Sequence, residues 1–421
     1  MSAVPRSSAL APLRVRAFLF QWPADLFTSW AFEMETLILG WYILVETGSV
    51  FMLTVFGASQ YLGTLIAPMF GVVGDRVGHR NLLAGMRSVY TILAALLMAL
   101  AAAGLLAPAP VLVIAMLSGL VRPSDQGMRA ALVAERMPPE HLIPAASISR
   151  TTTDSARIAG ALAGAGLFAA LGMAPAYLAV TLIYAAGFVL TLCVPRARPA
   201  PPASAIASAP ARRPSPWRDL GEGIRYIWHT PHLLAGLWLA FLVNLTAFPF
   251  SSGLLPFVAR DLYGTDQTGL GYLAASFACG ALVGSVVLSL VGARMRPARM
   301  MLAFGVAWYA MLLVFAQMQS LATGMLVLFA TGFVQSLSMV PLTVLLLRTA
   351  GDRFRGRVMG VRMMAIYSLP LGLLGAGVLI GEIGFRATAT LYAAFGLACI
   401  ALIALRWRTP LFKAELSADG V

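Results

Sequence analysis

Acidic side chains inside a long apolar run are the groups of this chain best suited to chemistry, because a carboxylate within a membrane can bind and release protons. Residues 17–45 carry Asp25, Glu33 and Glu35. An acid at the centre of a lipid-facing helix costs about 2.5–3.5 kcal/mol, so we expect at least one to face a wet cavity or a basic partner. Glu33 lies nearest the middle of the run and is the predicted proton site, with Asp25 as helper and Glu35 as a more structural acid of the cavity. Acids locked in structural ion pairs are the alternative.

The fourth apolar run carries charges at helical spacing. Arg122, Asp125, Gln126 and Arg129 occupy positions i, i+3, i+4 and i+7, so they share one face of a helix. An arginine stays charged at this depth and can hold a neighbouring carboxylate ionised until substrate or a proton intervenes. We therefore predict that Arg122 and Asp125 take part in proton coupling. A ladder of salt bridges that braces the helices is the alternative.

Other polar and aromatic side chains within apolar runs are candidates for a substrate cavity. Arg157 follows Asp154 at spacing i, i+3, so we expect an internal ion pair between them. Asn244 and Gln335 are uncharged polar groups inside apolar runs and need partners. The predicted cavity residues are Trp30, Glu35, Arg157, Asn244, Tyr309, Gln335 and Arg362. Ordinary packing is the alternative for each.

The composition indicates that the apolar runs lie in lipid and not in water. The chain is 59% apolar and 11% charged, with a mean hydropathy of +0.83, whereas soluble domains carry about 25% charged residues. The 421 residues suit about twelve membrane spans joined by short loops. We therefore predict an all-α membrane protein. The expected spans lie near residues 17–45, 50–73, 82–106, 108–133, 147–171, 174–194, 232–259, 267–293, 299–317, 320–349, 357–382 and 386–405.

The middle of the chain separates two sets of six expected spans. Residues 195–216 are rich in Pro, Ala and Ser and predict a linker, and residues 217–229 have one apolar face, which predicts an amphipathic helix on the membrane surface. The spacing of Arg150 and Gly160 is loosely repeated by Arg362 and Gly372, which favours two related halves. The predicted domains are a bundle at 1–194, a cytoplasmic linker at 195–230, a second bundle at 231–408 and a tail at 409–421.

The charge pattern excludes several classes of function. The net charge is +13, and the basic residues gather in alternate connections and in both tails, which predicts that both termini are cytoplasmic. No basic stripe is interleaved with aromatic residues, so nucleic acid is not an expected partner. No phosphate-binding Gly-x-x-x-x-Gly-Lys-Ser/Thr motif and no metal-spaced His/Cys cluster occurs in the sequence. We expect no enzyme activity, no cofactor and no metal, and a monomer whose partners are lipid, protons and a small molecule.

A compact charged turn, Gly-Val-Val-Gly-Asp-Arg-Val-Gly-His-Arg at residues 71–80, separates the second and third expected spans. It resembles the signature loop of the major facilitator superfamily, with His79 where that family usually has a base. The resemblance implies two pseudo-symmetric six-helix bundles and a conformational latch on the cytoplasmic side. The implied latch residues are Gly71, Asp75, Arg76, Gly78 and Arg80. Asp125 or Glu135 is expected to join Asp75 and Arg80 there.

Further motifs resemble particular parts of that superfamily. Arg122-x-x-x-Gln126-Gly127 is similar to its fourth-helix motif linked with proton coupling, and residues 160–166 are similar to the fifth-helix motif of exporters, although they contain no proline. Residues 333–335 and 352–360 resemble the branch of macrolide and siderophore (enterobactin-type) exporters. The resemblance implies a multi-pass protein of the bacterial inner membrane that exports amphiphilic, drug-type molecules in exchange for protons by alternating access. A siderophore exporter, a metabolite importer and a non-transporting membrane receptor are the alternatives.

Overall fold

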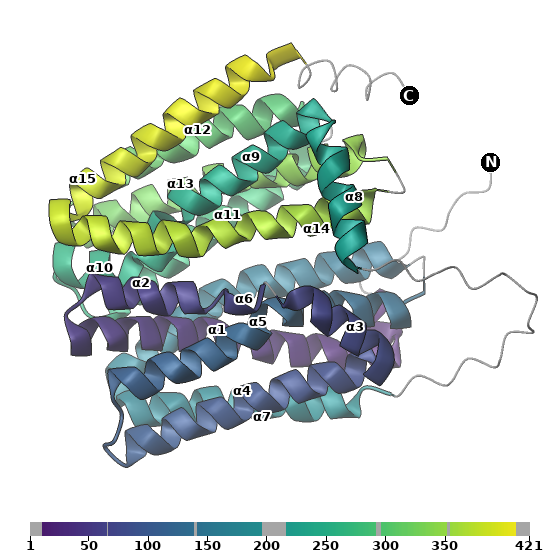
Figure 1. Ribbon diagram of the computed structural model, residues 1–421. Helices are drawn as coiled ribbons and strands as arrows, with labels where there is room; N and C mark the ends of the chain where they lie inside the picture. The colour runs from purple at the N-terminus through teal and green to yellow at the C-terminus, as the bar shows by residue number, and fades with distance from the viewer. Residues whose placement is uncertain are drawn as a thin grey trace, which may run out of the picture. The chain divides into compact units, whose positions relative to one another are not determined.

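The computed structural model describes residues 11–64, 66–138, 141–195, 216–291, 296–351 and 354–409, and their regular structure is helical without strands (Figure 1). The predicted all-α class is confirmed. Most of the predicted linker and the predicted tail lie outside the described residues. The described chain forms two compact units: unit 1 runs to Thr36 and resumes at Leu62, and unit 2 comprises Leu37–Tyr61 and the chain from Pro216 onward. The predicted domain boundaries stay a prediction.

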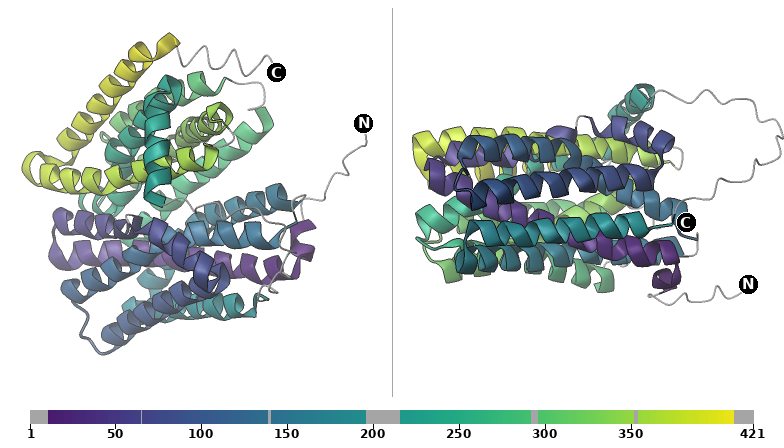
Figure 2. Two further views of the ribbon diagram at one scale, coloured as in Figure 1. Left: turned by 45° about the vertical axis from the view of Figure 1, so that its right-hand side comes forward. Right: turned by 90° about the horizontal axis from the view of Figure 1, so that it is seen from below.

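Unit 1 is built around an antiparallel pair of helices, α4 and α7, which lie side by side in Figures 1 and 2. Single glycines with positive φ join helices here: Gly78, at φ 88°, connects α3 to α4, and Gly172, at φ 80°, connects α6 to α7. Only glycine adopts such angles without strain. The helices of this unit are the first part of α1 (Arg16–Thr47), then α3 (Ala67–Val77), α4 (His79–Ala102), α5 (Pro108–Arg136), α6 (Leu142–Leu171) and α7 (Met173–Cys193).

Unit 2 has a core of α11, α12 and α13, and α15 packs against α2 and α9. The approach of α11 to α13 requires glycine, because a Cβ on Gly332 would lie 2.0 Å from the carbonyl oxygen of Phe277. The long α15 changes direction at Gly384, whose φ is 80°. The helices are α2 (Val50–Ser59), α8 (Pro216–Trp228), α9 (Pro231–Thr246), α10 (Leu255–Phe257), α11 (Gln267–Val291), α12 (Pro297–Phe315), α13 (Leu321–Thr349), α14 (Arg355–Met364) and α15 (Ser368–Arg406).

Seven stretches of the described helices are long and apolar enough to cross a membrane. The last of them, Gly356–Arg406, contains the bend at Gly384 and so holds two of the expected spans. The other expected spans correspond to α1, the broken pair α2 and α3, α5 and α6. Three of these, α1, α5 and α6, carry buried or half-buried charged side chains, which lower their hydropathy.

The expected span at 50–73 is not one regular helix. The chain leaves α2 after Ser59, forms a 3₁₀ turn at Leu62–Thr64 and starts α3 at Ala67. The physical reason is a close approach to α5, since a Cβ on Gly63 would lie 1.9 Å from the carbonyl oxygen of Leu120. The turn at Gly63 brings backbone against backbone at a point where a regular helix with side chains could not fit.

Candidate functional site

Four charged side chains form a buried ionic cluster inside unit 1. Asp25 of α1 pairs with Arg87 of α4, and Asp125 pairs with Arg129 of α5. The Nε of Arg129 also lies 3.7 Å from Oδ1 of Asp25, so this guanidinium contacts both carboxylates. Arg87 and Asp125 are fully buried. Two carboxylates opposite two guanidiniums balance in charge, which is the condition under which buried ions are tolerated.

Backbone and hydroxyl groups hold the ionic cluster in place. Arg87 donates a hydrogen bond to the hydroxyl of Thr191 on α7. Arg129 donates to the hydroxyl of Ser29 at 2.7 Å and to the carbonyl oxygen of Asp25 at 3.1 Å, while Gln21 donates to the carbonyl oxygen of Arg129 at 3.0 Å. These bonds tie α1, α4, α5 and α7 together around the charges.

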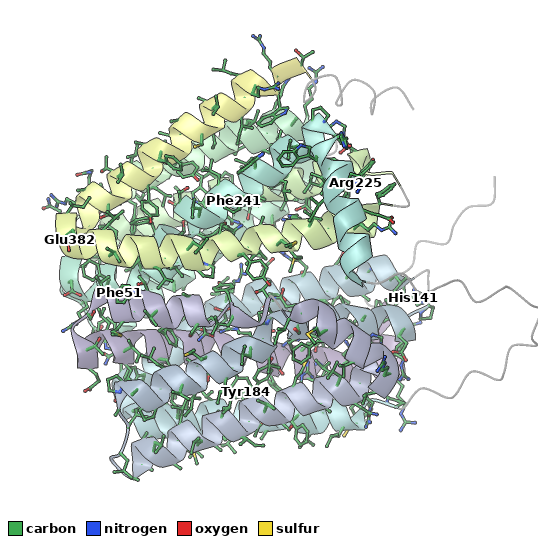
Figure 3. All side chains as sticks on the ribbon, in the orientation of Figure 1. Phe51, His141, Tyr184, Arg225, Phe241 and Glu382 are labelled. Carbon is green, nitrogen blue, oxygen red and sulfur yellow. The ribbon has the colours of Figure 1, made fainter. Side chains whose placement is uncertain are left out.

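A second polar group lies further along α1. Tyr184 of α7, labelled in Figure 3, donates a hydrogen bond to Oε2 of Glu35 at 2.7 Å, and both side chains are buried. The ring of Phe32 lies 5.6 Å from that of Tyr184, in an edge-on arrangement. The guanidinium of Arg122 stands 4.5 Å from the centre of the Phe32 ring and donates to the hydroxyl of Thr36 at 2.8 Å. Arg122 therefore makes a cation–π contact and a hydrogen bond on α1.

Glu33 occupies a different environment from the other two acids of α1. Its side chain is 33% exposed, and the Nε of Arg157 on α6 lies 3.9 Å from its carboxylate. The Arg157 side chain is itself 49% exposed. Gly160 lets α6 approach this point, because a Cβ there would lie 2.7 Å from the Cβ of Glu33 and 3.0 Å from the carbonyl oxygen of Trp30. Glu33 thus combines a partly exposed side chain with a loose ionic contact.

The expected ion pair between Asp154 and Arg157 is wrong. Asp154 instead pairs with Arg150, one helical turn before it, at 3.0 Å. Arg157 lies near Glu33, on the neighbouring helix α1. Both i, i+3 and i, i+4 spacings bring side chains together on a helix, and the position of α1 decides between them.

The structure spreads the predicted cavity residues of unit 2 over several helices. Tyr309 of α12 is fully buried, and its hydroxyl bonds with that of Thr246 and with the carbonyl oxygen of Leu242 at 3.3 Å. Asn244 donates to the carbonyl oxygen of Ala240 at 2.8 Å, which gives its amide nitrogen a partner within α9. Gln335 of α13 and Arg362 of α14 are half-buried, as is Trp30 in unit 1.

The charged turn at residues 71–80 contacts α5 and the end of α7. His79 lies 3.1 Å from the carboxylate of Glu135, and Arg80 donates to the carbonyl oxygens of Val194, at 2.7 Å, and Leu192. Of the two acids expected to join the turn, Glu135 contacts it, whereas Asp125 is engaged with Arg129 inside the unit. Gly71 and Arg76 lie on α3, Arg76 exposed, and the side chain of Asp75 lies outside the described residues.

Comparison with known proteins decides the family. The model of the Major Facilitator Superfamily matches residues 22–370 and 250–419. The chain belongs to the Major Facilitator Superfamily. Membership makes it a multi-pass membrane protein of a family of transporters, which are generally not enzymes. A search of curated proteins gave no significant match.

Solved structures share the superfamily fold across nearly the whole chain. The nucleoside transporter NupG is 12% identical and superposes with a TM-score of 0.71 over 94% of this chain and 99% of its own. The POT family transporter PepTSo is 12% identical, with a TM-score of 0.74 over 94% and 99%. A D-xylose-proton symporter is 10% identical, with a TM-score of 0.66 over 92% and 96%. At these identities the likeness concerns the fold.

The sequence did not predict that Arg87 contacts Asp25 or that Tyr184 contacts Glu35 in this transporter-family protein. A signal existed for Arg87, because a lone arginine inside the apolar run 82–106 needs an acid and Asp25 was the one at matching depth. No pattern in the sequence distinguishes Tyr184 from other tyrosines. The predicted proton-coupling set divides in the structure: Asp25 and Asp125 share the ionic cluster, Arg122 lies beside Phe32, and Glu33 lies beside Arg157.

Proposed function

We propose that this protein is a secondary active transporter that exports amphiphilic small molecules in exchange for protons, with Glu33 as the proton site. Membership of the Major Facilitator Superfamily supports transport. One observation carries the proton site: Glu33, an acid of the expected first span, keeps 33% of its side chain exposed, with the Nε of Arg157 at 3.9 Å. A carboxylate must reach water or substrate and must be held loosely if it is to change its protonation state during a cycle.

The other acids of α1 are less suited to that role. Asp25 contacts the guanidiniums of both Arg87 and Arg129 and is buried, so its protonation would leave buried positive charge uncompensated. Glu35 is buried and accepts a hydrogen bond from Tyr184. We therefore assign Asp25 and Asp125 a structural role in the ionic cluster, which differs from the helper and coupling roles expected from the sequence.

The proposed cycle follows from the pairing of Glu33 with Arg157. An ionised Glu33 attracts a cationic or polar substrate, and protonation of its carboxylate weakens that attraction so that the substrate leaves. Loss of the proton resets the site. We further propose that the protein lies in a bacterial inner membrane with both termini in the cytoplasm, as the distribution of basic residues favours.

The proposal is tested in proteoliposomes with an imposed pH gradient and the fluorescent cation ethidium as probe. Wild type should move ethidium only while the gradient persists, and Glu33→Gln should lose that movement. Glu382→Gln, at an exposed acid of α15, is the matched control and should transport as wild type does. Unchanged flux after collapse of the gradient, or full activity in Glu33→Gln, would refute proton coupling through this residue.

Export of an anionic ligand, as in the siderophore alternative, is the second candidate. It is favoured by the half-exposed Arg157, which gains free positive charge whenever Glu33 is protonated. Substrate-induced stabilisation of the purified protein separates the two candidates. Stabilisation by catecholate anions at low pH that is lost in Arg157→Gln would favour the anionic ligand, whereas stabilisation by lipophilic cations that is lost in Glu33→Gln would favour the first candidate. A response to neither class of ligand would leave a metabolite importer or a receptor.

A further inference from the structure

The helix α8 is docked firmly against the rest of unit 2 through one of its faces. Glu222 forms an ion pair of 2.8 Å with Arg357 of α14. The ring of Tyr226 stacks on that of Phe354, with centroids 4.2 Å apart and planes within 6°. Ile227 is 2% exposed. An ion pair, an aromatic stack and a buried aliphatic side chain together fix how the helix is rotated about its axis.

The opposite face of α8 is exposed and amphipathic. The exposed residues of this face lie three or four positions apart on successive turns, so they form one stripe along α8 and the residue after it. They are Gly221, Ile224, Arg225, Trp228 and His229. We call these five residues the outer stripe. Trp228 is 65% exposed and Ile224 42% exposed, which is unusual for large apolar side chains on a surface that meets only water. Basic groups alternate with them, and Arg225 is labelled on α8 in Figure 3.

The direction of α8 differs from that of its neighbours. Figure 1 shows α8 running across the direction of α9, which is among the helices able to span a membrane and against which α8 packs together with α14. A helix that crosses membrane-spanning helices at their ends lies roughly in the plane of the bilayer. Trp228 ends α8 only three residues before Pro231 begins α9, so the outer stripe is held at the level where a span enters the membrane.

We propose that the outer stripe is a binding surface for anionic phospholipid, with Ile224 and Trp228 inserted among the lipids and Arg225 paired with their phosphates. Tryptophan with an apolar neighbour and an arginine is the side-chain set that amphipathic helices use at the interface between headgroups and acyl chains. Each basic residue at an anionic leaflet contributes about a fivefold preference, from roughly 1 kcal/mol. This inference concerns unit 2 alone and does not depend on the substrate or on proton coupling.

The insertion is tested on the full-length protein in lipid nanodiscs by tryptophan fluorescence. The chain has 8 tryptophans, so the emission of wild type minus that of Trp228→Phe isolates Trp228. This difference should be quenched by lipids brominated on the acyl chain and protected from iodide in the buffer. Quenching by iodide without quenching by bromolipid would show that the stripe faces water. Protection from both quenchers would show that a protein surface covers it. Either result overturns the proposal.

The preference for anionic lipid is tested in the same nanodiscs. Trace brominated phosphatidylglycerol should quench Trp228 about fivefold more effectively than trace brominated phosphatidylcholine. The ratio should fall toward one in Arg225→Gln and with rising salt, since headgroup attraction is screened. Arg386→Gln, at an exposed arginine of α15, is the matched control and should leave the ratio unchanged. A ratio near one in wild type, or no change in Arg225→Gln, contradicts the assignment.

Discussion

Tyr184 donates a hydrogen bond of 2.7 Å to the carboxylate of Glu35, and this contact joins α7 to α1 at a buried position. Tyr184→Phe removes the donor while keeping the ring against Phe32. We expect the free energy of unfolding to fall by about 1–3 kcal/mol, because a buried acceptor loses its partner. Thermal unfolding of the purified protein measures the loss. Tyr272→Phe, at a tyrosine that is 45% exposed, should have no such effect, and equal stability of the two variants would contradict the role of the bond.

The pairing of Asp25 with Arg87 in the ionic cluster predicts that the double substitution destabilises the protein less than the single one. Arg87→Met leaves the buried carboxylate of Asp25 with only the Arg129 guanidinium, 3.7 Å away. We expect a loss of about 3–5 kcal/mol, which is typical of breaking a buried pair from one side. The double variant Asp25→Asn/Arg87→Met removes both charges and should recover much of the loss. If the double variant were as unstable as the sum of the two single variants, Asp25 and Arg87 would not be coupled.

The sequence predicted the helical class, the apolar runs and the need of the α1 acids for a partner or a cavity, because each of these depends on local composition. It did not predict the break between α2 and α3, which depends on the carbonyl oxygen of Leu120 in a distant helix. The partner of Asp154 was predicted wrongly for a related reason, since two spacings are equivalent along one helix and only the position of α1 chooses between them. Local patterns thus indicate that a charge needs a partner, and packing between helices decides which partner it has.

Gly160 and Gly166 of α6 should respond in opposite ways to substitution by alanine, because only Gly160 lies against a neighbouring helix. A Cβ there meets the Cβ of Glu33 at 2.7 Å and the carbonyl oxygen of Trp30 at 3.0 Å. Since backbone atoms cannot move aside, Gly160→Ala must push α6 away from α1, and we expect a cost of about 1–3 kcal/mol. Gly166→Ala meets nothing within 4 Å and should stabilise the helix by up to about 1 kcal/mol. Unfolding midpoints of the two variants should therefore move in opposite directions from wild type.

Tyr263 follows η5, the short π-helix at Val258–Leu262, and precedes α11. Its partly buried phenol should lower the stability of the folded protein at high pH. Burial raises the pKa of Tyr263 from 10 to about 12, and the ring packs against α13, where a Cβ on Gly324 would lie 2.6 Å from the hydroxyl oxygen. The folded state therefore keeps the phenol proton after the unfolded chain has lost it. The resulting stabilisation is complete below about pH 10 and decreases as the pH rises toward 12.

Tyr263→Phe removes the titrating group, so the difference in unfolding midpoint between this variant and wild type should be constant below pH 10. Between pH 10 and 12 it should shift in favour of the variant. A difference that stays constant up to pH 12 would show that the Tyr263 hydroxyl is not buried in the folded protein.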